Sequence, residues 1–247
     1  MSEEHVTLKK STYNKLVYGL IVVLIIASFT SGYVVGGLGR TSGTVAQQPT
    51  QQAQPTTNNQ PSTVSLSIPS YVPYQGQSSA TVNVVEFGDY QCPFCERFFT
   101  QTEPQIVQNY VDTGKVKFYF MDFAFLGPDS QTLAQGAWCA DEQGKYYAYH
   151  DYIYGHQGQE NSGWATADKL KTMVANIQGL NTAAFGSCLD SGKYSSRVSE
   201  LTQLGQSEGV SGTPSTLIGN DANGYDLVVG AQPYSVLQQS IEAALAA

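Results

Sequence analysis

Hydrophobic and polar positions divide the chain into a long apolar stretch, a polar segment and a region with the periodicity of folded structure. Leu16 to Leu38 contains no charged residue, and as a helix it would span about 34 Å, enough to cross a bilayer. A cleaved signal peptide is the alternative, but its apolar part usually has only about 7 to 15 residues. We therefore predict a retained transmembrane anchor over residues 16–38.

Charges around the apolar stretch predict its orientation. Lys9, Lys10 and Lys15 precede it, and only Arg40 closely follows it. The cytoplasmic flanks of membrane helices carry the excess of Lys and Arg. We therefore expect residues 1–15 to be a cytoplasmic tail of a single-pass protein of the cell membrane, with everything after the anchor outside the cytoplasm.

The polar segment that follows does not have the composition of a folded domain. Residues 39–63 are rich in Gln, Pro and Thr and have almost no large apolar residue, so they cannot bury enough surface to fold. We expect a disordered tether there. Residues 64–247 are then one domain of ordinary size.

Within that domain, strand and helix patterns alternate in a definite order. Alternation and helical periodicity predict a strand at Thr81–Phe87, a helix at Glu96–Val111 that Pro104 kinks, a strand at Lys115–Phe123, a helical subdomain over about 130–207, strands at Thr216–Ile218 and Tyr225–Val229, and a helix at Ser235–Ala246. A strand–helix–strand half and a strand–strand–helix half, separated by a helical insert, make a thioredoxin-like α/β arrangement.

Cys92-Pro93-Phe94-Cys95 follows the first of these strands and opens the first helix. Backbone N–H groups and the positive end of the helix dipole favour a thiolate at this position, and Pro93 suits a first helical turn because it has no N–H to leave unpaired. The spacing of three residues brings Cys95 beside Cys92, close enough for a disulfide. We expect a redox pair in which Cys92 is exposed and Cys95 is shielded.

Half of a zinc site is the alternative, because cysteines separated by two residues also occur in zinc modules. The sequence has no second pair of that spacing, and its three histidines do not form a tight ligand cluster. We therefore expect no metal and no other cofactor. His150 is interpreted as a helix-surface or packing residue.

The net charge and the cysteine content bear on the protein's partners and on its cellular compartment. The formal net charge is −8, and the basic residues after the apolar stretch form no cluster of the kind that binds phosphates, which excludes a nucleic-acid partner. The four cysteines all follow the apolar stretch. Their position and even number are typical of an oxidising compartment.

The segment Val85–Cys95, with the sequence VEFGDYQCPFC, resembles the active-site segment of the DsbA family of thiol-disulfide oxidoreductases. Other stretches resemble the family's helical insert, its cis-proline loop and the start of its last helix: Trp138–Ala140, Gln143–Lys145, His150–Asp151, Gly209–Pro214 and Gly230–Tyr234. The resemblance covers the chain from about Val82 to its C-terminus.

This resemblance implies a thioredoxin fold interrupted by a helical domain, and donation of disulfides to newly exported proteins with free thiols. It implies a cis bond between Thr213 and Pro214, beside the cysteine pair, with the Thr213 backbone aligning an extended client segment. For Glu86, an acidic residue in a strand suited to burial, it implies a proton relay beneath Cys95. A carboxylate at the strand's end that water reaches is the alternative.

Two further features concern the remaining cysteines and the residue between the redox pair. Cys139 and Cys188 lie in apolar, helix-like settings, and we interpret them as a structural disulfide; two free buried thiols and a second redox pair are the alternatives. Phe94 departs from the histidine of many strong oxidants in the family. It offers no charge or side-chain hydrogen bond to a Cys92 thiolate.

The expected function is therefore an extracytoplasmic oxidoreductase that introduces disulfides into exported proteins through Cys92 and Cys95. Its expected partners are these clients and a quinone-linked membrane protein that re-oxidises the pair. A reductase or isomerase that uses the same chemistry in the opposite direction remains open, for example in cytochrome or copper-protein assembly. A non-enzymatic chaperone or copper carrier is the alternative from another class, although no Met or His lies beside Cys92.

Overall fold

The structure, a computed structural model, describes residues 63–247. The expected cytoplasmic tail, anchor and nearly all of the tether lie outside the described residues. Among the helices of residues 63–247, none has the length and apolar character needed to span a membrane.

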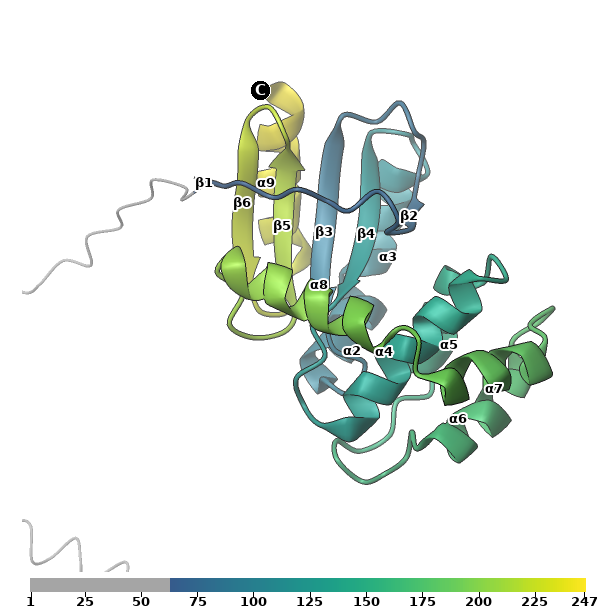
Figure 1. The fold of residues 1–247 in the computed structure, drawn as a ribbon. Helices are drawn as coiled ribbons and strands as arrows, with labels where there is room; N and C mark the ends of the chain where they lie inside the picture. Colours follow the sequence, from purple (N-terminus) through teal and green to yellow (C-terminus); the bar gives the residue numbers. More distant parts are fainter. Residues whose placement is uncertain (1–62) are drawn as a thin grey trace, which may run out of the picture. The chain divides into compact units, whose positions relative to one another are not determined.

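A mixed six-stranded sheet forms the centre of the domain (Figure 1), in the order β1-β6-β5-β3-β4-β2. Its strands are β1 at Thr63–Val64, β2 at Tyr74–Gln75, β3 at Val82–Gly88, β4 at Val116–Asp122, β5 at Ser215–Asn220 and β6 at Gly224–Val229. β3 and β4 are parallel, and all other pairs are antiparallel. The four longer strands lie where the sequence pattern predicts them, whereas the two-residue strands β1 and β2 are too short for any periodicity to indicate.

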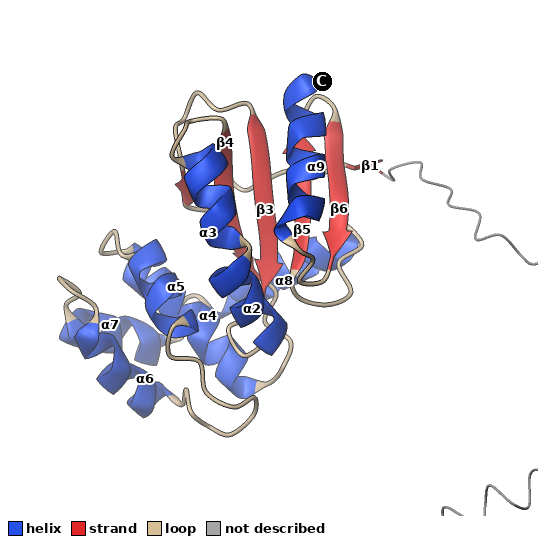
Figure 2. Ribbon diagram, turned by 180° about the vertical axis from the view of Figure 1, so that it is seen from behind, coloured by secondary structure: helices blue, strands red, loops and turns tan. Residues whose placement is uncertain are grey.

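Helices cover both faces of this sheet. α2 at Pro93–Gln101, α3 at Glu103–Ile106 and α9 at Tyr234–Ala246 lie on one face, in front in Figure 2, whereas α8 at Ser195–Ser207 crosses the other face in Figure 1. All seven residues of β3 are buried because the strand is central and covered on both sides. A charged residue in this strand is therefore removed from water.

The expected long helix from Glu96 to Val111 is instead three segments. α2 ends at Gln101, α3 follows from Glu103, and Val107–Val111 is a π-helical turn. Pro104 has no N–H to donate to the carbonyl four residues earlier, so the regular helical ladder cannot pass through it. The break, with Thr102 at φ −108°, brings Glu103 into a buried position.

The helical insert is confirmed and lies at the end of the sheet toward which β3 and β4 run (Figure 2). Its helices are α4 at Pro128–Asp141, α5 at Tyr146–Tyr154, α6 at Ala167–Met173, a 3₁₀ turn at Val174–Asn176 and α7 at Thr182–Ser191, before α8 leads back to the sheet. The Cys92–Cys95 segment follows β3 after a short loop of residues 89–91. It therefore lies between the sheet and the insert.

Candidate active site

The loop between β3 and α2 is held by the buried side chain of Asp89. Its Oδ1 accepts hydrogen bonds from the Gln91 backbone N–H at 2.8 Å and the Ser130 hydroxyl at 2.7 Å. Its Oδ2 accepts from the backbone N–H groups of Phe125 at 3.0 Å and Leu126 at 3.1 Å. Asp89 thus ties the segment before the cysteines to the β4–α4 connection and fixes where α2 begins.

Cys92 is the N-cap residue of α2, and Pro93 is the first residue of the helix. The Cys92 carbonyl accepts hydrogen bonds from the backbone N–H groups of Cys95 at 3.0 Å and Glu96 at 3.1 Å. The Gln157 side chain, from the insert, donates to the same carbonyl at 3.1 Å and to that of Tyr90 at 2.9 Å. The cysteine segment is therefore positioned by backbone hydrogen bonds of α2 and by a side chain of the helical insert.

The expectation that Cys92 is exposed is wrong. Its relative exposure is only 5%, against 0% for Cys95. The reason is the loop before β5, because the Cys92 thiol donates a hydrogen bond to the Thr213 carbonyl at 3.3 Å. The family resemblance implies that Thr213 and Pro214 lie beside the cysteine pair, but not that their loop buries Cys92.

The two thiols have pKa shifts of opposite direction. The pKa of Cys92 is lowered to about 6, first because the Cys95 thiol donates a hydrogen bond to its sulfur; the backbone N–H groups of Cys95 and Phe94 add to this, and burial opposes it. The pKa of Cys95 is raised well above 9.0, first by burial, then by the hydrogen bond to Cys92 and by the charge of Glu86. A single thiolate on this pair is therefore favoured on Cys92.

The Thr213–Pro214 peptide bond is cis. After it, Ser215 begins β5, which pairs with β3 through Phe87, and Pro214 accepts a hydrogen bond from the Gly230 N–H at 2.8 Å. The backbone of Thr213 thus lies beside Cys92 and at the end of a sheet strand, an arrangement in which an extended segment can align.

Glu86 lies inside β3 with 1% relative exposure, and neither carboxylate oxygen has a hydrogen-bond partner among the described residues. Its pKa is raised well above 4.5, first by burial and then by the neighbouring Cys92. The alternative of a carboxylate that water reaches is excluded by this burial. A fully buried carboxyl group without a partner favours its protonated form.

Known proteins share this sequence and arrangement. The family model described as Thioredoxin matches residues 70–242. A probable disulfide bond formation protein D from Bacillus cereus is 34% identical over 152 residues, which are 60% of this chain and 70% of that protein. The disulfide bond formation protein D of Bacillus subtilis is 28% identical over 173 residues, 69% of this chain and 75% of the relative.

Solved structures agree with the sequence relatives. The crystal structure of oxidised BdbD from Bacillus subtilis superimposes with a TM-score of 0.66 at 25% identity, covering 75% of this chain and all of that one. A thioredoxin-like oxidoreductase from Silicibacter pomeroyi gives a TM-score of 0.59 at 29% identity, covering 71% of this chain and 93% of that one.

This chain belongs to the thioredoxin family as a DsbA-like thiol-disulfide oxidoreductase. The thioredoxin-like fold with a helical insert, inferred from the sequence pattern, is confirmed. In this DsbA-like domain the cysteines lie at a helix N-terminus because they stand where the chain passes from β3 into α2 within the strand–helix–strand half of the fold.

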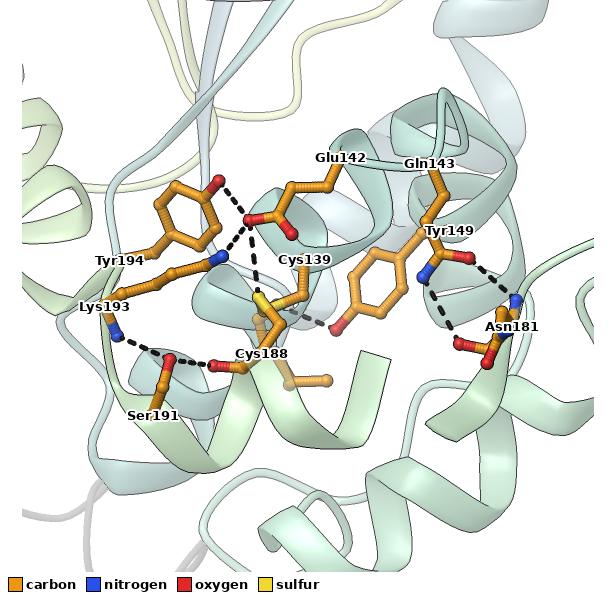
Figure 3. Close-up of a disulfide and its surroundings, with 10 residues drawn as sticks. Cys139, Glu142, Gln143, Tyr149, Asn181, Cys188, Ser191, Lys193 and Tyr194 are labelled. Atoms are coloured by element: carbon orange, nitrogen blue, oxygen red, sulfur yellow. Dashed lines mark hydrogen bonds and ion pairs between the residues drawn. A yellow bond between two sulfur atoms is a disulfide. The ribbon is translucent and has the colours of Figure 1, made fainter. Parts of the chain in front are cut away.

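The second cysteine pair of the DsbA-like domain is a disulfide between α4 and α7, from Cys139 to Cys188 (Figure 3). Polar contacts flank it. Glu142 accepts a hydrogen bond from the Tyr194 hydroxyl at 2.6 Å and forms an ion pair with Lys193, and Asn181 exchanges hydrogen bonds with Gln143. The bridge therefore joins two helices of the insert, away from Cys92 and Cys95.

Sequence reasoning missed several residues of this site. Asp89 and Gln157 hold the cysteine segment, and Glu103 is buried near Glu86. His150 is fully buried, so its packing interpretation holds and its surface interpretation does not. For Asp89 the signal was present, an acidic residue directly after a buried strand; for Gln157, an ordinary polar residue in the insert, there was none.

Glu86, Glu103 and His150 are also the residues whose donor atoms could hold a cation. One atom from each lies within 4.8 Å of the others, and all three side chains are buried. Carboxylate and imidazole groups can bind divalent metals or exchange protons. No sequence pattern indicated that these three residues from β3, α3 and α5 would meet.

Proposed function

We propose that Cys92 and Cys95 are the redox pair with which this oxidoreductase introduces disulfides into exported proteins. The observation that carries the proposal is the pair of opposite pKa shifts at the start of α2, with the pKa of Cys92 lowered to about 6 and that of Cys95 raised. Such a pair has one sulfur that leaves readily as a thiolate and one that holds its proton.

In the proposed cycle, a client thiolate attacks Cys92 Sγ of the Cys92–Cys95 disulfide. A client–Cys92 disulfide forms, the Cys92–Cys95 bond breaks, and Cys95 leaves as a thiolate and takes a proton. A second client thiolate then attacks the client sulfur and expels the Cys92 thiolate. The client has lost two electrons, and the enzyme has gained them as a dithiol.

The direction of the reaction follows from the stability of the Cys92 thiolate. A thiol with a lowered pKa is the better leaving group, and a stabilised thiolate makes the reduced enzyme more stable relative to its disulfide. This favours oxidation of clients over the reductase alternative. The groups that lower the pKa of Cys92 are the Cys95 thiol, the Thr213 side chain and the backbone N–H groups of Cys95 and Phe94, so this stabilisation does not depend on a histidine at position 94.

Exposed apolar side chains near the pair support unfolded clients as substrates. Phe94 is 53% exposed, Phe125 is 47% exposed next to Leu126, and Val229 is 54% exposed opposite Ser215 in the sheet. Unfolded chains offer apolar segments that such residues can contact. The cis-proline loop supplies the backbone of Thr213 for hydrogen bonds to an extended client. In this proposal Pro214 shapes that loop.

Location and re-oxidation complete the proposal. An oxidant of exported proteins works outside the cytoplasm, and the apolar segment 16–38 would anchor it there with residues 1–15 inside. A quinone-linked membrane protein would take electrons from the reduced pair. Mass spectrometry of the native protein tests the anchor, because a mature N-terminus within residues 39–63 would contradict retention.

The deciding experiment is equilibration of the full-length protein with glutathione redox buffers, followed by acid quenching and mass analysis of the Cys92–Cys95 peptide. We expect a reduction potential above that of the glutathione pool, so that the enzyme oxidises clients. A potential below that pool would favour the reductase alternative. Cys95→Ala should trap clients as mixed disulfides on Cys92, and Cys92→Ala should abolish their capture.

A further inference from the structure

A cluster of buried titratable side chains extends from the cysteine pair into the insert. Glu86, Glu103 and His150 have relative exposures of 1%, 4% and 0%. Both oxygens of Glu86, Oε2 of Glu103 and Nε2 of His150 have no hydrogen-bond partner within residues 63–247. Unpaired polar atoms are rare in a folded interior and are costly unless they have a task.

The cluster begins at Cys95. The Glu86 charge is close enough to that thiol to contribute to its raised pKa, and the Cys95 side chain has 0% relative exposure. Each opening or closing of the Cys92–Cys95 disulfide places a proton on Cys95 or removes one. That proton cannot be exchanged directly with solvent, because no surface of Cys95 is in contact with water.

The cluster ends at Asp151. His150 Nδ1 lies 3.0 Å from Oδ1 of Asp151, whose side chain is 57% exposed. The imidazole is otherwise enclosed by aromatic rings, with centroids 4.7 to 6.0 Å away: Tyr90, Phe99, Phe120, Tyr147 and Tyr154. Burial raises the pKa of each of these three tyrosines well above 10.0, so they keep their protons.

We propose that Glu103 and His150 carry protons between Glu86 and Asp151, so that the buried Cys95 thiol exchanges its proton with water through the insert. The inference rests on the proposed function and deepens it, because it names residues of α3 and α5 that the thiol chemistry requires. The separation of up to 4.8 Å between the donor atoms of the cluster is closed by side-chain movement or a water molecule during transfer.

The chemistry of imidazole makes such a relay reversible. With Nδ1–H donating to Asp151, Nε2 has a free lone pair that accepts a proton from Glu86 or Glu103, and Nδ1 then releases its own proton through Asp151 to water. When a client is oxidised, Cys95 takes up a proton and the transfer runs inward. When the pair is re-oxidised it runs outward, so one full cycle restores the original tautomer.

The raised pKa values of both carboxyl groups agree with this role. Burial is the first cause for Glu86 and for Glu103, whose pKa is raised to about 8, and the charge of His150 opposes the shift at Glu103. Groups that hold a proton near neutral pH are efficient partners in proton transfer. Protonated carboxyl groups are poor ligands for a divalent cation, which is the competing use of the same atoms.

The test separates the two steps of enzyme re-oxidation. Reduced full-length protein is mixed with oxidised glutathione, quenched in acid at increasing times, alkylated and weighed by mass spectrometry. Formation of the glutathione–Cys92 disulfide reports attack by the Cys92 thiolate. Its decay reports loss of the Cys95 proton and closure of the Cys92–Cys95 bond, which expels glutathione as a thiolate.

We expect Glu103→Gln and His150→Gln to slow the decay by roughly tenfold to a hundredfold and to leave formation unchanged. The solvent deuterium isotope effect on the decay should rise, because proton movement then limits closure. Asp151→Asn should slow the decay less, since water can approach the edge of the imidazole there. A purely structural role would not raise the isotope effect of one step alone.

Matched controls are Glu200→Gln and His156→Gln, which make the same chemical changes at exposed positions. Unchanged decay in folded Glu103→Gln protein would overturn the relay, as would equal slowing in the controls. Glu103→Gln changes the shape of the side chain little, so this variant tests the relay even if His150→Gln does not fold.

A stoichiometric divalent cation in the purified protein, lost in Glu103→Gln, would also overturn the proton relay. Failure of the glutathione–Cys92 disulfide to form at all would instead refute the proposed function.

Discussion

At the scale of the residue, two identical thiols three positions apart acquire opposite chemistry from where the helix places them. Cys92 is the N-cap residue of α2, and the backbone N–H groups of the first turn help to lower its pKa, whereas Cys95 lies inside the helix near Glu86 and has no contact with solvent. Helix-terminal stabilisation of charge is confined to the first turn. Cys92 therefore suits the role of the attacked sulfur, and Cys95 suits the role of the sulfur that closes the disulfide again.

This difference predicts the pH dependence of alkylation in the reduced protein. Labelling of Cys92 with iodoacetamide should rise through a midpoint near pH 6, because its pKa is lowered to about 6, while Cys95 stays unlabelled over the same range. Peptide mapping after timed labelling measures both. First labelling at Cys95, or a Cys92 midpoint near the roughly 8.5 of an unperturbed thiol, would contradict the proposed roles.

Glu86→Gln should separate proton transfer from nucleophilic attack. The amide cannot accept a proton from Cys95, so we expect closure of the Cys92–Cys95 bond to slow by roughly tenfold or more, with alkylation of Cys92 nearly unchanged. The Cys95 pKa should fall, because one of the charges that raises it is removed. If the exposed variant Glu200→Gln slows closure equally, the carboxyl group of Glu86 has no special part in the reaction.

At the scale of the element, connections between helices and strands build the site. The β3–α2 loop depends on Asp89 from its own segment and on Gln157 from the insert, and the loop before β5 covers Cys92. The insert is itself joined by the Cys139–Cys188 bridge between α4 and α7. The cross-linked insert thus supplies the side chain of Gln157, which contacts the cysteine segment.

The bridge in the insert should stabilise the fold without taking part in the redox reaction. It closes a loop with a sequence separation of 49, which in the chain-entropy model stabilises by up to about 4 kcal/mol. We expect the double variant Cys139→Ala, Cys188→Ala to lose a measurable part of this in urea unfolding while keeping the Cys92 alkylation profile. Under mild reductant the bridge should outlast the active-site disulfide, because the lowered pKa of Cys92 stabilises the reduced form of the active-site pair; recovery of free Cys139 before free Cys92 would contradict this.

At the scale of the whole molecule, burial of several carboxyl groups links stability to pH. The pKa of Glu103 is raised to about 8 and that of Asp122 to about 7, both first by burial, and that of Glu86 is raised as well. In the unfolded chain these groups have pKa values of about 4. Between the two values the folded protein binds more protons than the unfolded chain, so its stability falls as pH rises.

The effect of the buried carboxyl groups on stability is best measured in the oxidised protein, because its cysteines do not titrate. Its free energy of unfolding should fall from about pH 5 to about pH 8, with a slope of up to roughly 1.4 kcal/mol per pH unit for each such group. Glu103→Gln should flatten the slope above about pH 5, because it removes one of these titrating groups. Urea unfolding over this range is the measurement; stability that rises with pH, or a slope unaffected by Glu103→Gln, would show that these carboxyl groups are not protonated in the fold.

The sequence by itself determined the elements and the reactive pair. Local periodicity placed β3 to β6, α9 and the helical insert, and the strand-to-helix position of Cys92 indicated its chemistry, because hydrophobic patterns and helix-terminal effects act between residues close together in the chain. Tertiary structure decided what depends on distant segments meeting. The cover over Cys92 comes from Thr213, the break before Pro104 turns Glu103 inward, and β3, α3 and α5 bring Glu86, Glu103 and His150 together. No local pattern records such meetings, because each is set by the packing of the whole domain around its sheet.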